Sequence, residues 1–167
     1  MTFERLKVFF DSLNEEKKGF YSLTELLQYK LLAIQKQQGK IIGIAGVLPR
    51  NVLFLGVVPK NLLFLIVKSN YQNRGIGQKL TKKVIQKAIR RNYSYLALYV
   101  FKSNSKAIHI YLKLGFRKVY SPFMRTTCFM MLPLNTVGWL FFPLLYAYFF
   151  ITPLKDLLKT ICVLFNR

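Results

Sequence analysis

The residues best suited to chemistry lie where a strand-like pattern gives way to a helix-like one. Residues 62–67 are uninterrupted hydrophobics, which is typical of a buried strand. From Ile76 onward, apolar residues recur at helical spacing among lysines and arginines. This order leaves the first N–H groups of the helix without partners and directs the positive end of its dipole outward. Gly75 and Gly77 lack Cβ atoms, so a pyrophosphate can approach the backbone there.

The spacing of the glycines distinguishes this turn from other phosphate-binding loops. No Gly-Lys-Ser/Thr follows, so it is not a Walker loop, and Leu80 stands where the dinucleotide pattern G-x-G-x-x-G needs its last glycine. The stretch resembles the pyrophosphate loop of the GNAT acyltransferases, Q/R-x-x-G-x-G/A. The resemblance implies that acetyl-CoA is the co-substrate and that backbone groups around Leu65 and Val67 meet its pantetheine arm and thioester carbonyl. Its pyrophosphate would lie on six residues: Gln72, Asn73, Arg74, Gly75, Ile76 and Gly77.

A second motif stands one predicted strand downstream. Residues 103–116 resemble the GNAT signature S-N-x-x-A-x-x-x-Y-x-K-L-G-F, and they follow the loop in the order that the family has. Residues 98–104, L-Y-V-x-x-S-N, most resemble the branch that acetylates ribosomal proteins and protein N-termini, without fixing the substrate. The resemblance implies that Asn104 bonds the pantetheine arm, with a purely structural helix cap as the alternative.

Acetyl transfer needs a neutral amine, a polarised thioester carbonyl and a proton for the departing thiolate. The resemblance implies that Tyr111 is that acid. A phenol with an unperturbed pKa of about 10 is a suitable donor to a thiolate whose conjugate acid has a pKa of about 8.5. The alternative for Tyr111 is an aromatic ring that packs the helix against the sheet, and the two roles are compatible.

No obvious general base accompanies this acid. The sequence has no Asp or Glu between Leu26 and Lys155, which excludes a glutamate base on the central strands. Water, a backbone carbonyl, a tyrosine or the single histidine, His109, would have to take the proton. His109 lies two positions before Tyr111, and such residues do not share a helix face.

The lack of carboxylates also predicts a positive field around the loop. It favours a neutral or anionic amine, or a peptide N-terminus, over a polyamine as acceptor. Four cations could steer the phosphates of CoA or could simply form a solvated basic face: Lys68, Arg74, Lys79 and Lys106.

Composition limits the class of protein. The 167 residues include 26 Lys and Arg against 6 Asp and Glu, a formal charge of +20, which predicts an anionic partner. A hydrophobic share of 53% argues against a disordered basic tail. No RNP motif, zinc finger or arginine-rich arm is present, so nucleic acid is not expected. Cys128 and Cys162 have no metal-ligand spacing, so no metal site is predicted. The first eleven residues lack the apolar run of a secretory signal.

Helical and strand-like patterns alternate along the chain, which predicts an α/β (α+β) layer fold. The resemblance implies the GNAT fold, a central mixed, mostly antiparallel sheet flanked by helices. Helices are expected at residues 2–13, after a capping box at residues 22–25, from Ile76, and from a cap at residues 103–105 to Gly115. Strands are expected at residues 31–35, 41–48, 52–58, 62–67, 95–101, 116–120 and 127–132, with a hairpin turn at residues 37–40.

An apolar helical appendage is predicted to follow. We assign residues 1–134 to the acyltransferase domain and residues 135–167 to a membrane-associating segment. Residues 136–153 would rise about 27 Å as a helix, close to the roughly 30 Å hydrocarbon core, although Pro143 would kink it. Residues 154–165 have an amphipathic pattern. The segment could cross, re-enter or lie flat, and the basic domain is expected on the cytoplasmic side. Alternatively, it covers the sheet or forms a dimer contact.

The leading hypothesis is a membrane-associated, acetyl-CoA-dependent N-acyltransferase that transfers an acetyl group to a primary amine by direct attack on the thioester. Its expected partners are acetyl-CoA, an amine acceptor and a membrane surface reached through residues 136–165. Two alternatives stay open. One is a basic binding module of the same fold that docks on acidic membrane or RNA without turnover, and the other is an acyltransferase for a lipid-linked amine or amino sugar.

Overall fold

The computed structural model describes residues 3–13, 30–48, 61–119, 124–140, 142, 143 and 147 of the chain. Six strands form one sheet in the order β1-β2-β3-β4-β6-β5, and the printed pairs β1–β2, β2–β3 and β5–β6 are antiparallel. The chain divides into two compact units, residues 1–96 and 97–167. The predicted fold class, a mixed sheet with flanking helices, is confirmed. The elements are α1 (Phe3–Asp11), β1 (Lys30–Gln37), β2 (Lys40–Leu48), β3 (Leu62–Val67), η1 (Ser69–Tyr71), α4 (Ile76–Arg90), β4 (Tyr95–Phe101), α5 (Ser105–Lys113), β5 (Arg117–Val119) and β6 (Thr127–Pro133).

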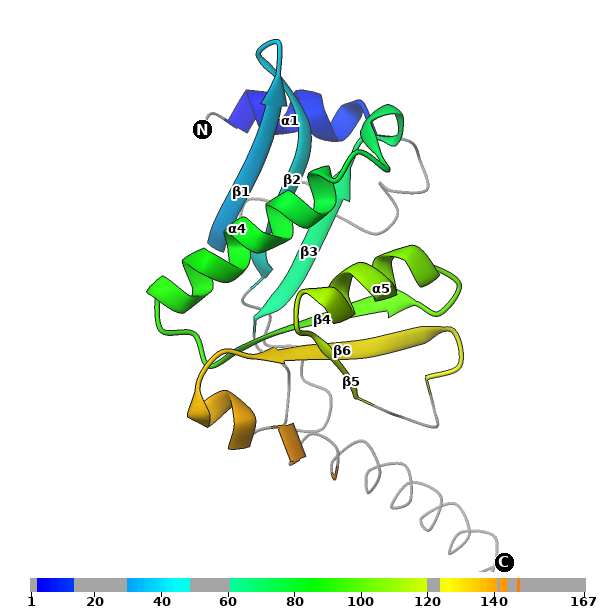
Figure 1. Cartoon of the computed structure of the whole chain (residues 1–167). Helices are drawn as coiled ribbons and strands as arrows, with labels where there is room; N and C mark the ends of the chain where they lie inside the picture. Colours follow the sequence, from blue (N-terminus) through cyan, green and yellow to red (C-terminus); the bar gives the residue numbers. More distant parts are fainter. Residues whose placement is uncertain are drawn as a thin grey trace, which may run out of the picture. The chain divides into compact units, whose positions relative to one another are not determined.

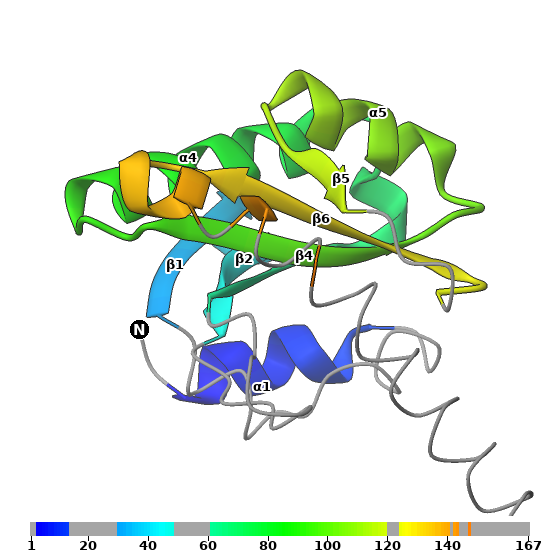
Figure 2. The same ribbon diagram turned by 90° about the horizontal axis from the view of Figure 1, so that it is seen from below.

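The first unit is built on the antiparallel strands β1, β2 and β3. The predicted hairpin turn is present at Gln38 and Gly39, which have φ angles of 48° and 74°. This pair of left-handed residues suits a tight hairpin. Residues 41–48 of β2 are all buried, as expected for a strand covered on both faces. In Figures 1 and 2, α1 lies on one face of these strands and α4 lies on the other.

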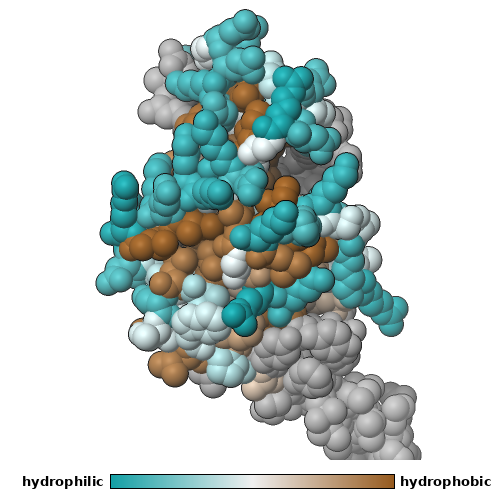
Figure 3. Space-filling view, in the orientation of Figure 1, coloured by the Kyte–Doolittle hydropathy of each residue, from teal (hydrophilic) through white to brown (hydrophobic). Residues whose placement is uncertain are grey.

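The packing of α4 against β2 positions the end of β3. Leu80, Val84 and Ala88 are fully buried along one side of α4, which contacts β1, β2 and β3. A Cβ atom on Gly43 of β2 would lie 3.0 Å from Cδ1 of Leu80, so the glycine permits this close approach. On the other face of the strands, Phe9 of α1 packs into the core. Hydrophilic side chains cover the outer side of α4 (Figure 3).

The second unit contains α5 and the strands β5 and β6, together with most of β4. Phe116, Phe129 and Met130 are fully buried in it. The rings of Tyr99 on β4 and Phe129 on β6 lie 5.0 Å apart between centroids. Gly115, the predicted end of the α5 helix, has φ 91°, a left-handed conformation typical of the residue after a helix.

Several predictions fall outside the described residues. They are the capping box at residues 22–25, the apolar run at residues 52–58 and most of the tail beyond residue 143. The described part of the tail starts with a short helix at residues 136–140, where the Gly138 N–H donates to Oδ1 of Asn135 at 3.0 Å. None of the helices within the described ranges has both the length and the apolar character needed to cross a bilayer.

Candidate functional site

One set of the predicted site residues lies in the first unit, where β3 ends. The apolar run of β3 stops at Val67, and the Lys68 N–H still donates to the Ile42 carbonyl of β2 at 3.0 Å. The chain then turns through η1, in which the Tyr71 N–H donates to the Lys68 carbonyl at 2.9 Å. This turn brings the chain within five residues to the start of α4. The predicted order of strand, turn and helix is therefore confirmed.

Two left-handed residues shape the loop itself. Asn73 has φ 58° and Gly75 has φ 72°. Gly75 is the N-cap of α4, and its carbonyl accepts the first helical bond, from the Lys79 N–H at 3.0 Å. A glycine has no side chain to cap the helix, so the first N–H groups of α4 have no acceptor from their own N-cap. Asn73, Arg74 and Gly75 are exposed, whereas Ile76 and Gly77 are half-buried.

The two glycines of the loop serve different purposes. A Cβ atom on Gly75 would meet nothing within 4 Å, so its left-handed backbone is what favours glycine there. A Cβ atom on Gly77 would lie 3.1 Å from Cδ2 of Leu65, so this glycine lets the first turn of α4 pack closely on β3. The sequence had predicted open access for a ligand at both positions. The structure gives that access at Gly75 and a packing role at Gly77.

Two side chains, one in the loop and one in α4, hold the loop backbone in place. Nε2 of Gln72 donates to the Val67 carbonyl at 3.2 Å, which fastens the loop to the end of β3. Oγ1 of Thr81 donates to the Gly77 carbonyl at 2.9 Å, and Thr81 is fully buried. Sequence reasoning missed Thr81. A hydroxyl four residues after the last loop glycine, on the apolar side of the helix, is the signal that could have identified it.

The predicted cations near the loop are differently placed. Nζ of Lys68 lies 5.7 Å from the centre of the Phe9 ring, and the guanidinium carbon of Arg74 lies 5.4 Å from the centre of the Tyr71 ring. Both distances are within the range of cation–π contacts. Lys79 is exposed.

Another set of the predicted site residues lies in the second unit, at the start of α5 and along it. Asn104 is the N-cap of this helix, and its Oδ1 accepts a hydrogen bond from the Ala107 N–H at 3.1 Å. The predicted alternative role of Asn104 as a helix cap is therefore confirmed. Asn104 is exposed, and this bond uses only its oxygen, so its amide NH₂ can still donate to a ligand.

Tyr111 is nearly buried, with 9% of its surface exposed. Its ring meets that of Phe116 edge to face, with 5.6 Å between centroids, and the Phe116 N–H donates to the Tyr111 carbonyl at 3.0 Å. The packing role predicted as the alternative for Tyr111 is thus present. His109 is exposed, so the two residues lie on different faces of α5, as their spacing predicted.

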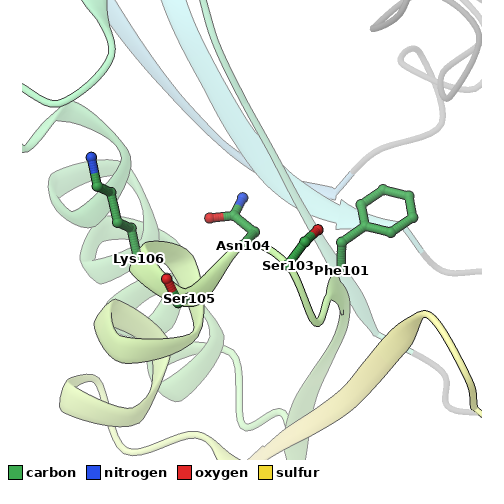
Figure 4. Close-up of a pocket in the computed structure, with 5 residues that line it drawn as sticks. All are labelled: Phe101, Ser103, Asn104, Ser105 and Lys106. Carbon is green, nitrogen blue, oxygen red and sulfur yellow. The ribbon is translucent and has the colours of Figure 1, made fainter.

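An open hollow of about 390 Å³ surrounds the start of α5. In the view of Figure 4, the polar ends of Ser103 and Asn104 lie between the ring of Phe101 and the ammonium group of Lys106. The lining combines hydroxyls, an amide and one cation at a helix N-terminus, where the dipole favours negative charge. This hollow could therefore bind polar or anionic parts of a ligand.

The predicted site residues group into two sets. Leu65, Val67 and residues 72–77 lie together in the first unit, while Asn104 and Tyr111 lie together in the second. Neither α4 nor α5 has an acidic residue in its first turn. Within the described residues, no group of three or more His, Cys, Asp or Glu side chains could hold a metal ion.

Comparison with known proteins gives a family and a fold. A model of the acetyltransferase (GNAT) family matches residues 3–116, more than half of the chain. No protein of curated function matches the sequence. The ribosomal-protein-alanine N-acetyltransferase of Brucella melitensis is 21% identical, with a TM-score of 0.63 over 80% of this chain and 97% of that chain. The ribosomal-protein-S18-alanine N-acetyltransferase of Escherichia coli is 25% identical, with a TM-score of 0.53 over 70% of this chain and 79% of that chain.

A third solved structure contains the co-substrate. It is yncA from Salmonella typhimurium with its cofactor acetyl-CoA, 22% identical, with a TM-score of 0.55 over 72% of this chain and 73% of that chain. The strand, loop and helix at residues 62–90 and the match over residues 3–116 agree with the family. The chain therefore belongs to the acetyltransferase (GNAT) family and is an N-acetyltransferase that uses acetyl-CoA.

Proposed function

We propose that the chain acetylates the N-terminal amine of a peptide or protein at a membrane surface, with the loop at residues 72–77 binding the pyrophosphate of acetyl-CoA. The observation that carries the proposal is the left-handed Gly75 at the start of α4. It leaves the N-terminus of a 15-residue helix without a side-chain cap and without an acidic residue in its first turn. A diphosphate supplies the acceptors and the negative charge that this helix start lacks.

The strand before the loop and the cap of α5 would receive the rest of the co-substrate. Backbone groups of Leu65 and Val67 are assigned to the pantetheine arm and the thioester carbonyl. The amide donors of Asn104 are assigned to the same arm, since its Oδ1 is used by the Ala107 N–H. Lys79 and Lys106 are exposed cations that would attract the phosphates during approach.

Tyr111 is the proposed acid. The amine nitrogen attacks the thioester carbon, the C–S bond breaks, the sulfur takes the phenolic proton, and the nitrogen releases one proton to solvent, from which the phenolate regains a proton. An unperturbed phenol keeps its proton at neutral pH, so a donor is available at the moment when the thiolate leaves. Packing of the ring against Phe116 would fix the direction of the hydroxyl.

The lack of Asp and Glu in the central part of the sequence indicates the class of acceptor. No carboxylate occurs between Leu26 and Lys155, and His109 does not share a face with Tyr111. The amine must then arrive neutral. With a pKa of about 7.7, roughly a third of an α-amine is neutral at pH 7.4, against about one thousandth of a lysine amine with a pKa of about 10.4. The Brucella and E. coli proteins are named as N-acetyltransferases of alanine in ribosomal proteins, and these names fit a preference for an α-amine.

Membrane association would come from residues 136–165, on the cytoplasmic side. At the start of this segment Val137, Trp139 and Leu140 are all exposed apolar residues. The Arg117 guanidinium carbon lies 4.8 Å from the centre of the Trp139 ring. A tryptophan beside a cation is the pairing that membrane interfaces favour, because the ring tolerates both headgroups and acyl chains.

Gly75→Glu should abolish acetyl-CoA binding, because the new side chain brings a negative charge to the place assigned to the pyrophosphate. The matched control is Gly39→Glu in the β1–β2 turn, where the glycine has φ 74° and equally open surroundings. Both variants carry the same backbone strain and charge. Thermal unfolding with acetyl-CoA at about 100 times its Kd should show roughly 2.7 kcal/mol of stabilisation in the control and none in Gly75→Glu. Equal stabilisation of the two would remove the loop from the site.

Tyr111→Phe should lower kcat by about 100-fold or more while leaving acetyl-CoA binding within about twofold, because only the donated proton is lost. The measurement is release of free CoA thiol under saturating substrates, paired with calorimetric titration of acetyl-CoA. Tyr93→Phe, at a half-buried tyrosine after α4, is the control and should behave as wild type. An unchanged kcat in Tyr111→Phe would leave the residue with its packing role alone.

A panel of acceptors tests the substrate class. A peptide with a free N-terminus should be acetylated at least about tenfold faster than the same peptide with a blocked N-terminus and one lysine, and spermidine should be slowest. The rate with the free N-terminus should rise with pH up to about pH 8, following deprotonation of its α-amine. Faster turnover of spermidine, or of the blocked lysine peptide, would contradict the assignment.

Removal of residues 135–167 should move the protein from the membrane fraction to the supernatant, because it deletes the apolar segment and leaves only a basic domain. Flotation on liposomes measures this directly. Stabilisation of the truncated protein by acetyl-CoA serves as the control for its folding. Recovery of the full chain in a detergent-free supernatant would rule out the membrane role.

A further inference from the structure

A second cavity lies in the second unit, apart from the hollow around Asn104. It measures about 360 Å³, within the range of about 300 to 1,000 Å³ that small-molecule sites occupy. Ile108 of α5, Val119 of β5 and Cys128 of β6 line it, with Met124 from the segment before β6. Val119 is buried and the other three are half-buried, so the walls are mostly aliphatic carbon and sulfur.

Thr127 of β6 and two lysines complete the lining. Lys102 follows β4, Lys118 lies on β5, and both are exposed. The Lys102 N–H donates to the Thr126 carbonyl at 2.8 Å, which ties the turn after β4 to the start of β6 and keeps this side of the cavity in place. The sequence offers these ammonium groups no carboxylate between Leu26 and Lys155. An apolar cavity edged by cations without acidic neighbours in sequence is complementary to an amphiphilic anion.

The thiol of Cys128 keeps the interior uncharged. Burial raises the pKa of Cys128, while Lys118 and Lys102 act in the opposite direction and do not overcome it. The thiol therefore stays protonated at neutral pH and does not compete with an anion for the lysines. Its Sγ lies 3.7 Å from the Phe129 carbonyl, to which it donates.

We propose that this cavity binds a medium-chain carboxylate, with the alkyl chain among Ile108, Val119 and Cys128 and the carboxylate between Lys102 and Lys118. The site does not involve residues 72–77, Asn104 or Tyr111, so occupancy does not require acetyl-CoA. The ligand is a free fatty acid rather than a membrane lipid, because a cavity of this size encloses one short chain and the lysines lie on its own lining.

Decanoate, below its critical micelle concentration, is the probe, and Cys128 is the reporter. In the full chain with Cys162→Ser, Cys128 is the only thiol. Saturating decanoate should slow its alkylation by iodoacetamide at least about fivefold, and decanol should protect less well. Protection should persist in Gly75→Glu, which separates this site from the acetyl-CoA site. Loss of protection in that variant, or equal protection by decanol, would overturn the proposal.

Charge variants test the position of the carboxylate. Lys118→Gln should weaken decanoate binding about two- to fivefold and the double variant Lys102→Gln/Lys118→Gln about tenfold, while both retain decanol binding. Lys113→Gln removes an exposed lysine at the end of α5 that does not line the cavity, and it should leave the Kd unchanged. Equal effects of Lys113→Gln and Lys118→Gln would show general charge attraction and overturn the proposed site.

Discussion

The left-handed backbone of Gly75 is the constraint on which the proposed acetyl-CoA site depends. With φ 72° the chain reverses between the end of β3 and the start of α4 in a space that leaves nothing within 4 Å of the missing side chain. A residue with a side chain would be strained there, and the usual polar caps, Ser, Thr or Asp, would occupy the N–H groups that a phosphate needs. The absence of a side chain at Gly75 therefore allows the turn and also suits the proposed ligand. Bonds from Gln72 to Val67 and from Thr81 to Gly77 then hold both ends of the turn.

The charges at the ends of α4 and α5 also suit a negatively charged ligand. Helices are usually stabilised by acidic residues in the first turn and basic residues in the last. The last turn of α4 has Lys87 and Arg90, and the last turn of α5 has Lys113. Neither helix has an acidic residue in its first turn. No acidic side chain therefore offsets the positive dipole at either N-terminus from within its own first turn. In the proposed site, the phosphates of the co-substrate supply negative charge there. The absence of carboxylates from the central part of the sequence also fits an acceptor whose own pKa provides a neutral amine.

Much of this could be predicted from sequence because the signals were local. The strands at residues 62–67 and 95–101 have the expected bounds, since each is an apolar run with polar residues on both sides. The cap at Asn104 and the stop at Gly115 also follow from single residue types. Other features depend on contacts between distant residues and could not be predicted. The packing of Gly77 on Leu65 and the approach of Gly43 to Leu80 both require the tertiary fold.

The two sets of site residues are supported by different packing, which affects how the enzyme tolerates change. The loop depends on α4, whose buried side chains Leu80, Val84 and Ala88 pack on β1, β2 and β3. Tyr111 depends on Phe116 and on the turn at Gly115 in the second unit. Under the proposed roles, a substitution in the first core should weaken acetyl-CoA binding before it affects proton donation, and one beside Phe116 should do the reverse. The proposed binding and chemistry are then separable properties of one chain, because the backbone assigned to the phosphates and the side chain assigned as the acid are held by different neighbours.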